Sequence, residues 1–277
     1  MDSAHVEVLE DRILLTGNVK AVVIGNDLIV EGDSGDNEIA LAVIDGNLVV
    51  QGINGTTINS AVSFLAIAGS ATIPNDLRIS MGSGDDVVLI RPGLQVGGDV
   101  TIDTAEGDDF INLDSTVIGN DLTIHSGQGD DTILLTGVSV GDDQRIDTGP
   151  GQDIVKIADS TIDDNLWIQT SQGNDVAVVV GTTVGDTGSV STGTGDDILG
   201  VDFLSSIFIS ETDSGTGQNQ ILSDRTVIEN LDEIIAAEDR VGELINPVAV
   251  DDSYSLAAEE GTLTVDALNG VLANDMF

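Results

Sequence analysis

Six glycine-rich turns each end in two positions that hold acidic or amide side chains. The turns read G-S-G-D-D (82–86), A-E-G-D-D (105–109), G-Q-G-D-D (127–131), G-P-G-Q-D (149–153), S-Q-G-N-D (171–175) and G-T-G-D-D (193–197). The second position is always aspartate: Asp86, Asp109, Asp131, Asp153, Asp175 and Asp197. The first is Asp85, Asp108, Asp130 or Asp196, with Gln152 and Asn174 in the other two turns. Every one of these side chains has an oxygen that can bind a hard cation.

Stacked turns would bring these carboxylates into columns, with neighbours about 4.8 Å apart. Two unit charges at that distance repel by roughly 0.9 kcal/mol in water and about 3.5 kcal/mol at an effective dielectric of 20. Such a column favours a bound cation, and carboxylate, amide and carbonyl oxygens together select calcium over zinc or copper. We predict calcium ligands among Asp85, Asp86, Asp108, Asp109, Asp130, Asp131, Asp153, Asn174, Asp175, Asp196 and Asp197.

Other interpretations of the turns stay open. One alternative is that each aspartate is a cap that accepts backbone N–H groups, as in an Asx-turn. Another is that the acids serve only to solvate the surface of a salt-adapted protein. A neighbouring hydroxyl column suggests an ice-binding face, although one column beside a turn is more typical of turn chemistry; it contains Thr104, Ser126, Thr148, Thr170 and Thr192.

The turns recur because the chain is a repeat of 22 residues. Glycines mark the period at Gly107, Gly129, Gly151, Gly173, Gly195 and Gly217, and Gly84, Gly55 and Gly35 extend the series at irregular spacings. Positions 111 and 113 are apolar and alternate with period two, which indicates a strand. Four apolar columns follow the same period: Ile102, Ile124, Ile146, Ile168 and Val190; Ile111, Ile133, Val155, Ala177 and Leu199; Leu113, Leu135, Ile157, Val179 and Val201; and Val96, Ile118, Val140, Ile162 and Val184.

A 22-residue unit with two or three short strands cannot bury its apolar face alone, whereas stacked units bury it continuously. We therefore predict an all-β fold, a parallel β-helix or β-solenoid with rungs of about 22 residues and about nine rungs in all. The coil is expected to be right-handed because parallel crossovers nearly always have that hand. A β-sandwich of short strands is the alternative.

One predicted strand is apolar on both faces. Positions 110 and 112 should point outward, yet their columns contain Val87, Phe110, Ile154, Val176, Ile198, Leu89, Leu134 and Val178. Strands that are apolar on both faces are normally covered. We expect residues 223–245 or a second subunit, through lateral self-association, to cover this face. The alternative is that β-branched residues stand there for strand propensity alone.

Composition divides the chain into four parts. They are an N-terminal motif segment (1–16), the solenoid (17–222), a capping segment (223–245) and a C-terminal stretch (246–277). In the capping segment Val227, Leu231 and Ile234 recur at helical spacing, and Thr226 with Glu229 forms a capping-box signature. A helix that closes the C-terminal end of the solenoid is therefore expected, with a further irregular rung as the alternative.

The acidic turn resembles the RTX nonapeptide G-G-x-G-x-D-x-U-x, which binds calcium in a parallel β-roll. Residues 105–112, A-E-G-D-D-F-I-N, match from its second position, and Thr104 stands in place of the first glycine. RTX units follow one another directly, with calcium on both edges, whereas this chain has one such turn per 22 residues. The resemblance therefore implies calcium sites along one edge of the solenoid.

Both ends of the chain resemble parts of large exported bacterial proteins. Residues 9–15, L-E-D-R-I-L-L, are similar to the LEPR-XLL motif, with Asp11 in place of its proline. Residues 246–277 resemble the start of a bacterial cadherin-like or Ig-like tandem repeat, through Pro247, Asp251, Asp252, Tyr254 and the G-V-L-A-N-D segment at 270–275. These resemblances imply an extracellular or cell-surface location, although residues 1–16 lack the charged and apolar regions of a complete signal peptide.

Composition limits the partners of the chain. Its 277 residues have a formal net charge of −41 and only 8 Lys or Arg. Nucleic-acid binding needs clustered cations and is not expected. No run of about 18 apolar residues exists, so membrane insertion is not expected either. The apolar fraction of 40% excludes an acidic disordered tail, and the lack of cysteine excludes disulfides and thiolate metal sites.

These observations favour a non-catalytic, calcium-binding structural or adhesive module of a large secreted or cell-surface protein, with other surface proteins or polysaccharide as partners. A carbohydrate-active β-helix enzyme, a polysaccharide lyase or hydrolase, is the alternative. A lyase needs a cation that faces an acidic sugar, yet Arg91, Arg145 and Lys156 fall in different columns. His5 and His125 lack the spacing of metal ligands. Trp167 is at an outward position, where incidental packing is favoured over a sugar platform.

Overall fold

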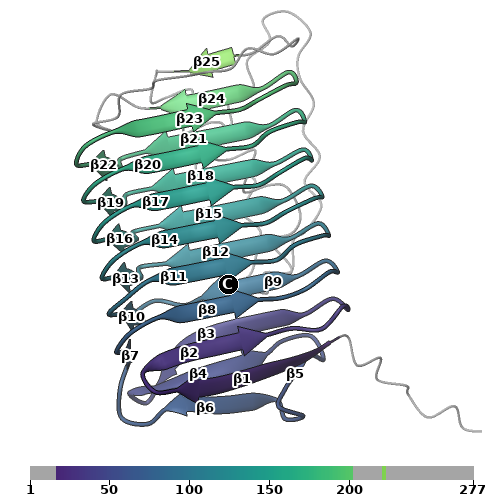
Figure 1. Cartoon of the computed structure of the whole chain (residues 1–277), viewed down its shortest axis with the longest axis vertical. Coiled ribbons are helices and arrows are strands. Elements are labelled where there is room, and N and C mark those ends of the chain that lie inside the picture. Colours follow the sequence, from purple (N-terminus) through teal and green to yellow (C-terminus); the bar gives the residue numbers. More distant parts are fainter. Residues whose placement is uncertain (1–16, 202–219, 223–277) are drawn as a thin grey trace, which may run out of the picture. The chain divides into compact units, whose positions relative to one another are not determined.

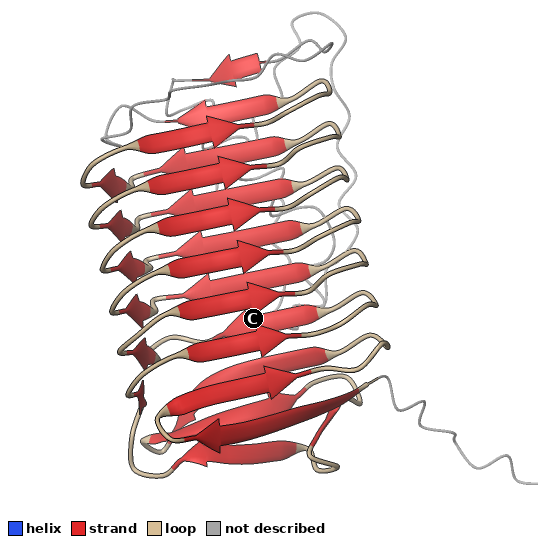
Figure 2. Cartoon of the chain, in the orientation of Figure 1, coloured by secondary structure: helices blue, strands red, loops and turns tan. Residues whose placement is uncertain are grey.

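The computed structural model describes residues 17–201 and 220–222, which all belong to the first of two compact units, residues 1–228. They form a parallel β-solenoid of about six turns with rungs of about 22 residues (Figures 1 and 2). From β8 upward, strands of the front sheet run to the right in Figure 1, rear strands run back to the left, and successive rungs climb, so the coil is right-handed. The predicted all-β fold, repeat length and hand are confirmed.

The first sheet is drawn in front in Figure 1, in the order β23-β20-β17-β14-β11-β8-β2-β1-β5. Like positions of successive rungs pair in register, as Ile102 does with Ile124 and Ile124 with Ile146. The strands are β1 (Asn18–Ile24), β2 (Asp27–Glu31), β5 (Thr57–Ile58), β8 (Leu77–Ser80), β11 (Val100–Asp103), β14 (Leu122–His125), β17 (Gln144–Asp147), β20 (Leu166–Gln169) and β23 (Gly188–Ser191).

Two further sheets complete each rung. The short strands of the second sheet are β7 (Thr72–Ile73), β10 (Gln95–Val96), β13 (Val117–Ile118), β16 (Ser139–Val140), β19 (Thr161–Ile162) and β22 (Thr183–Val184). The third sheet, at the rear, contains β3 (Glu38–Ile44), β4 (Asn47–Gly52), β6 (Ser63–Ile67), β9 (Val87–Ile90), β12 (Phe110–Asp114), β15 (Thr132–Thr136), β18 (Ile154–Ala158), β21 (Val176–Val180), β24 (Ile198–Val201) and β25 (Gln220–Leu222). The described residues contain no helix, hence none that is long and apolar enough to cross a membrane.

The N-terminal end of the solenoid consists of antiparallel hairpins rather than further rungs. β1 pairs with β2 across Gly25 and Asn26, and β3 pairs with β4 across Asp45 and Gly46. β6 then pairs antiparallel with β4. Asp-Gly is a strong signal for a two-residue hairpin turn, and Asp45 and Gly46 both have positive φ. The prediction of about nine rungs is therefore wrong, because the irregular glycine spacings before Gly84 belong to these hairpins.

The core lies between the three sheets and contains all four predicted apolar columns. Every member of these columns is buried, from Ile102, Ile111 and Leu113, which are fully buried, to Val201, which is 9% exposed. On the outward side of the third sheet, Leu89, Phe110 and Val178 are also buried, whereas Ile154 and Val176 are half-buried. This burial agrees in part with the predicted cover. The proposed covering segment and capping helix (223–245) lie outside the described residues, as do residues 1–16 and 246–277.

Candidate functional site

The acidic turns connect the first sheet to the third along one edge of the solenoid, on the right in Figure 1. Their backbone approaches the next rung so closely that glycine is required. Gly129 has a φ of +136°, and a Cβ built on it would lie 2.0 Å from the carbonyl oxygen of Gly107 in the preceding rung. Only a residue without a side chain can stack there. The 22-residue spacing of the glycines in the sequence therefore arises from close contact between the turns of successive rungs.

The second aspartate of each turn points into the solenoid and forms what we call the inner ladder. Asp86, Asp109, Asp131, Asp153 and Asp175 are fully buried, and Asp197 is 1% exposed. Each Oδ1 accepts a hydrogen bond from the backbone N–H of the equivalent residue in the preceding rung. The N–H of Asp86 donates to Asp109 at 2.8 Å and that of Asp109 to Asp131 at 2.9 Å, and the series continues to Asp197. The ladder thus satisfies turn amides that are buried between rungs.

The first acid of each turn belongs to an outer ladder on the opposite side of the backbone. Its members are exposed or half-buried: Asp85, Asp108, Asp130, Gln152, Asn174 and Asp196. Here the hydrogen bonds run the other way along the solenoid. The N–H of Asp108 donates to Asp85 Oδ1 at 2.9 Å, and that of Asp130 donates to Asp108 Oδ1 at 2.9 Å. Adjacent residues of one turn therefore bind neighbouring rungs on both sides, one inside and one outside.

Burial raises the pKa values of the inner ladder. Loss of hydration is the largest cause, and it raises the pKa of Asp131 to about 8, of Asp86 and Asp153 to about 7, and of Asp109 and Asp175 to about 6. Nearby carboxylates raise these pKa values further, whereas hydrogen bonds from backbone and side-chain donors lower them. Burial thus favours the protonated carboxyl throughout the inner ladder, and most strongly at Asp131.

The hydroxyl column lies inside the solenoid beside the inner ladder. Thr104, Ser126, Thr148 and Thr170 are fully buried, and Thr192 is 2% exposed. Thr148 Oγ1 donates a hydrogen bond to Asp153 Oδ2, and Thr104 and Thr170 donate to backbone carbonyls of the following rung at 3.1 and 3.0 Å. A buried column cannot meet ice, so the ice-binding interpretation is wrong. Its position is that of a turn-stabilising column.

The second carboxylate oxygens of the inner ladder are mostly unpaired. Oδ2 of Asp86, Asp109, Asp131 and Asp175 is buried and has no hydrogen-bond partner. An ionised oxygen in that position is costly, and a proton on it removes the charge. At Asp153 the Thr148 hydroxyl donates to Oδ2 instead.

The structure adds a member to each ladder that the sequence analysis missed. Asn37 is buried, and its N–H donates to Asp86 Oδ1 at 2.7 Å, so it precedes Asp86 in the inner ladder. Asp36 Oδ1 accepts the N–H of Asp85 at 3.1 Å in the outer ladder. The signal in the sequence is Gly35-Asp36-Asn37, but the β3–β4 hairpin and β6 come between this turn and the next acidic turn. Asn37 also shows that an amide can occupy an inner position.

The two ladders differ in how they fit a calcium ion. The inner carboxylates face the core, and their Oδ1 atoms already bind amides, so they do not fit as calcium ligands. The outer carboxylates reach solvent, but each turn offers only one. Within residues 17–201 and 220–222, no three acidic, histidine or cysteine side chains come together as a metal site needs. Calcium at the outer ladder would therefore have to bridge carboxylates of successive rungs.

The cations considered for an acidic sugar are not brought together. Arg145 lies on β17 in the first sheet, Lys156 lies on β18 in the third, and Arg91 follows β9. His125 ends β14, and His5 lies outside the described residues.

Comparisons with known proteins return no relative. No protein-family model matches the chain, and neither a curated protein nor a solved structure is similar enough to count as a match. Function must therefore be argued from the fold, the two ladders and the surface.

Proposed function

We propose that this chain is a non-catalytic structural module, a rigid spacer or adhesive rod, of a large secreted or cell-surface bacterial protein. In-register stacking carries the proposal: like residues of successive 22-residue rungs pair with one another along all three sheets. Stability in such a stack comes mainly from contacts between neighbouring rungs, which suits an element that holds other modules apart. A net charge of −41 keeps such a surface soluble and resists non-specific association.

The resemblances at the two ends of the chain support the same proposal. The LEPR-XLL-like residues 9–15 and the cadherin-like residues 246–277 are both typical of exported bacterial proteins built from many modules. They support an extracellular or cell-surface location and other surface proteins or polysaccharide as partners.

Calcium is the proposed cofactor, and the outer ladder is its proposed site. The RTX-like turn supports it, as does the succession of Asp85, Asp108 and Asp130 along one exposed edge. Asn174 and Asp196 continue the same column with an amide oxygen and a carboxylate. Hard oxygen ligands of this kind prefer calcium.

Surface labelling tests the proposed location and role. An antibody raised against residues 17–201 should label intact cells of the bacterium that makes the protein, without permeabilisation. A strain that lacks the gene is the control for specificity. External protease should remove the label. Labelling only after permeabilisation would contradict the proposal.

A carbohydrate-active enzyme is the second candidate, favoured by one observation. A hollow on the first sheet is lined by two carboxylates, Asp121 and Asp143, and by Arg145. Incubation with polygalacturonate, alginate and neutral glucans, followed by chromatography, tests it. New, shorter products that disappear in Asp121→Asn or Asp143→Asn would favour the enzyme over the structural module.

A further inference from the structure

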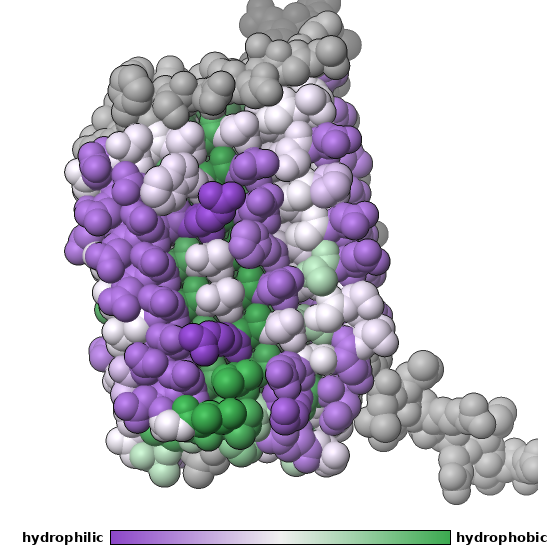
Figure 3. Space-filling model, viewed as in Figure 1, coloured by the Kyte–Doolittle hydropathy of each residue, from purple (hydrophilic) through white to green (hydrophobic). Residues whose placement is uncertain are grey.

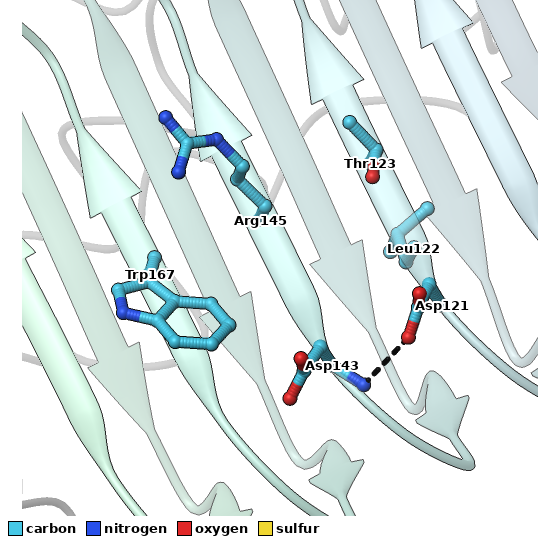
Figure 4. Close-up of a pocket in the computed structure, with 6 residues that line it drawn as sticks. All are labelled: Asp121, Leu122, Thr123, Asp143, Arg145 and Trp167. Carbon is cyan, nitrogen blue, oxygen red and sulfur yellow. Dashed lines mark hydrogen bonds between the residues drawn. The ribbon is translucent and has the colours of Figure 1, made fainter.

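The hollow lies on the first sheet, at the opposite ends of the strands from the acidic turns. Its volume is about 210 Å³, and it is lined by Asp121, Leu122, Thr123, Asp143, Arg145 and Trp167 (Figure 4). The lining comes from the starts of β14, β17 and β20, so the hollow spans three successive rungs. Figure 3 shows this face with hydrophilic residues along both edges and a strip of neutral and apolar residues between them, which two strongly hydrophilic groups interrupt.

The hollow forms where the repeat departs from its own pattern. Thr101, Thr123, Arg145, Trp167 and Ser189 pair in register as one outward column. Two large side chains thus follow two threonines. Trp167 is 37% exposed, and Figure 4 shows its indole face-on, lying along the sheet. Threonine at the equivalent positions shows that rung stacking does not need an aromatic ring, so the exposed indole face is available to a ligand.

The two carboxylates of the hollow are held in place by the next rung. Asp121 Oδ1 accepts the N–H of Asp143 at 3.0 Å. Asp143 Oδ1 accepts the N–H of Asn165 at 3.1 Å and its side-chain amide at 2.9 Å. No hydrogen bond from the described residues reaches Oδ2 of either aspartate. Both oxygens can therefore accept hydroxyl hydrogens from a ligand.

Arg145 adds a donor to these acceptors. Its Nη2 lies 3.9 Å from Asp147 Oδ2, a long contact, and its side chain is 51% exposed. Arg78, on the same sheet, is held instead by Asp76 at 2.7 Å and by Asp27 at 3.5 Å. The guanidinium of Arg145 therefore keeps N–H groups for a ligand, and Arg78 is its natural control.

The charges of the hollow disfavour an anionic ligand, because two carboxylates outnumber one guanidinium in a chain of net charge −41. A neutral molecule rich in hydroxyls meets acceptors and a donor without that penalty. The indole packs best against an apolar face, such as the C–H face of a pyranose ring. The volume is below the roughly 300–1,000 Å³ of pockets that enclose drug-sized ligands, which suits a single ring.

We propose that this hollow is a binding subsite for one ring of a neutral polysaccharide. The ring stacks on Trp167, its hydroxyls donate to Asp121 and Asp143, and Arg145 donates to one of its oxygens. The inference deepens the adhesive part of the proposed function and rests on it for its biological setting. It replaces the interpretation of Trp167 as incidental packing.

Tryptophan fluorescence tests the subsite directly, because Trp167 is the only tryptophan of the chain. The neutral probes are cellotetraose, maltotetraose and laminaritetraose, and the anionic probe is tetragalacturonate. At least one neutral probe should give a saturable change in emission that tetragalacturonate does not give. No saturable change with any neutral probe, or an equal change with tetragalacturonate, would overturn the proposal.

Variants then locate the binding, measured by calorimetry on the whole chain. Trp167→Ala should weaken affinity for the responding probe at least about tenfold, and Arg145→Ala severalfold. Arg78→Ala should bind as the parent does, and equal melting temperatures show that each variant is folded. Unchanged affinity in folded Trp167→Ala would overturn the proposal. Surface labelling does not depend on this hollow, so the two proposals can fail separately. If sugar binding is absent while intact cells are labelled, only the subsite is rejected. If labelling fails while sugar binding is observed, only the surface role is rejected.

Discussion

The inner and outer ladders put the same residue type, one position apart, into opposite environments. Asp130 is exposed and Asp131 is fully buried, yet both accept a backbone N–H from a neighbouring rung. Asp130 receives it from the following rung and Asp131 from the preceding one. The charge of Asp130 is hydrated, whereas a charge on Asp131 would have lost its hydration and would destabilise the fold.

Burial distinguishes the inner aspartates from the outer ones more than hydrogen bonding does. Asn37, at the end of the inner ladder, makes only half of the ladder contacts: its N–H donates to Asp86 Oδ1, but no hydrogen bond from the described residues reaches its own buried Oδ1. Burial favours a proton on each inner aspartate, which the fold holds more tightly than water does. The outer ladder, in contrast, has an exposed amide at Asn174, whose Oδ1 accepts the N–H of Asp196 as the neighbouring carboxylates accept theirs. The ladders should therefore respond differently to pH, to amide substitution and to calcium.

The largest expected effect is that of pH on stability. The pKa values of Asp86, Asp109, Asp131, Asp153 and Asp175 are about 6 to 8 in the fold, against about 3.9 in an unfolded chain. Between these values the folded protein binds more protons, so its stability must fall as pH rises. The contribution is fully present below about pH 4 and is lost through pH 6 to 8. Thermal unfolding should show a loss of several kcal/mol from about pH 5 to pH 8.

Surface repulsion also grows with pH and needs a control. At about 1 M salt the Debye length is about 3 Å, so repulsion among exposed acids is screened while the buried ladder is not. The loss of stability should persist in high salt. A melting temperature that is independent of pH between 5 and 8 under these conditions would show that the inner aspartates are not protonated in the fold.

Amide substitution at neighbouring positions should separate the ladders. Asp131→Asn keeps the acceptor for the N–H of Asp109 and removes the buried charge. At about pH 8, with chelator present, we expect it to stabilise the protein by about 2–4 kcal/mol, and the gain should shrink as the pH falls and vanish near pH 4. The matched control Asp130→Asn keeps the acceptor for the N–H of Gln152 at an exposed position, and it should change stability by no more than about 0.5 kcal/mol. Chemical denaturation of both variants measures the change in the free energy of unfolding. Equal changes at pH 8 would show that the two ladders do not differ in the cost of their charge.

The sequence predicted the stack well because stacking is periodic. Equivalent residues of successive rungs contact one another in the columns of Ile102 and Ile111 and at the turn glycines. The 22-residue period of the sequence therefore predicts the stacked fold. The hairpins at β1–β2 and β3–β4 break that period. The Asp45-Gly46 turn between β3 and β4 is itself a hairpin signal, but the glycine spacing favours further rungs there. A local turn signal should have outweighed an irregular glycine spacing there.

The candidate site was only partly predictable for a different reason. The sequence identified both acids of each turn, but period alone does not tell which of two adjacent residues faces the core. The sequence therefore predicts Asp108 and Asp109 as one set of ligands. In the structure they lie on opposite sides of the backbone, Asp108 partly exposed and Asp109 buried. The hydroxyl of Thr148 and the carboxylate of Asp153, five residues apart, form a pair that only the turn geometry reveals. Likewise, Trp167 gains its significance from Arg145 and Asp143 of the preceding rung.

Calcium should give the smallest effect of the three, and it should act through the outer ladder alone. Extracellular calcium sites have dissociation constants near 10⁻⁴ to 10⁻³ M, and a site formed by single carboxylates of successive rungs belongs at the weak end. About 10 mM calcium then stabilises by roughly 1.4 kcal/mol per site. We expect a modest rise in melting temperature relative to chelator, at a pH near 8. Asp108→Asn combined with Asp130→Asn should reduce that rise, whereas Asp109→Asn combined with Asp131→Asn should retain it in full. Magnesium at the same concentration separates binding from screening, because both salts screen surface charge equally.

The opposite result would place calcium in the core. If the inner double variant Asp109→Asn, Asp131→Asn lost the calcium response, those aspartates would have to be ionised ligands, against their raised pKa values. An unchanged melt between chelator and calcium would remove calcium from both ladders and leave the turns as hydrogen-bonded structure alone.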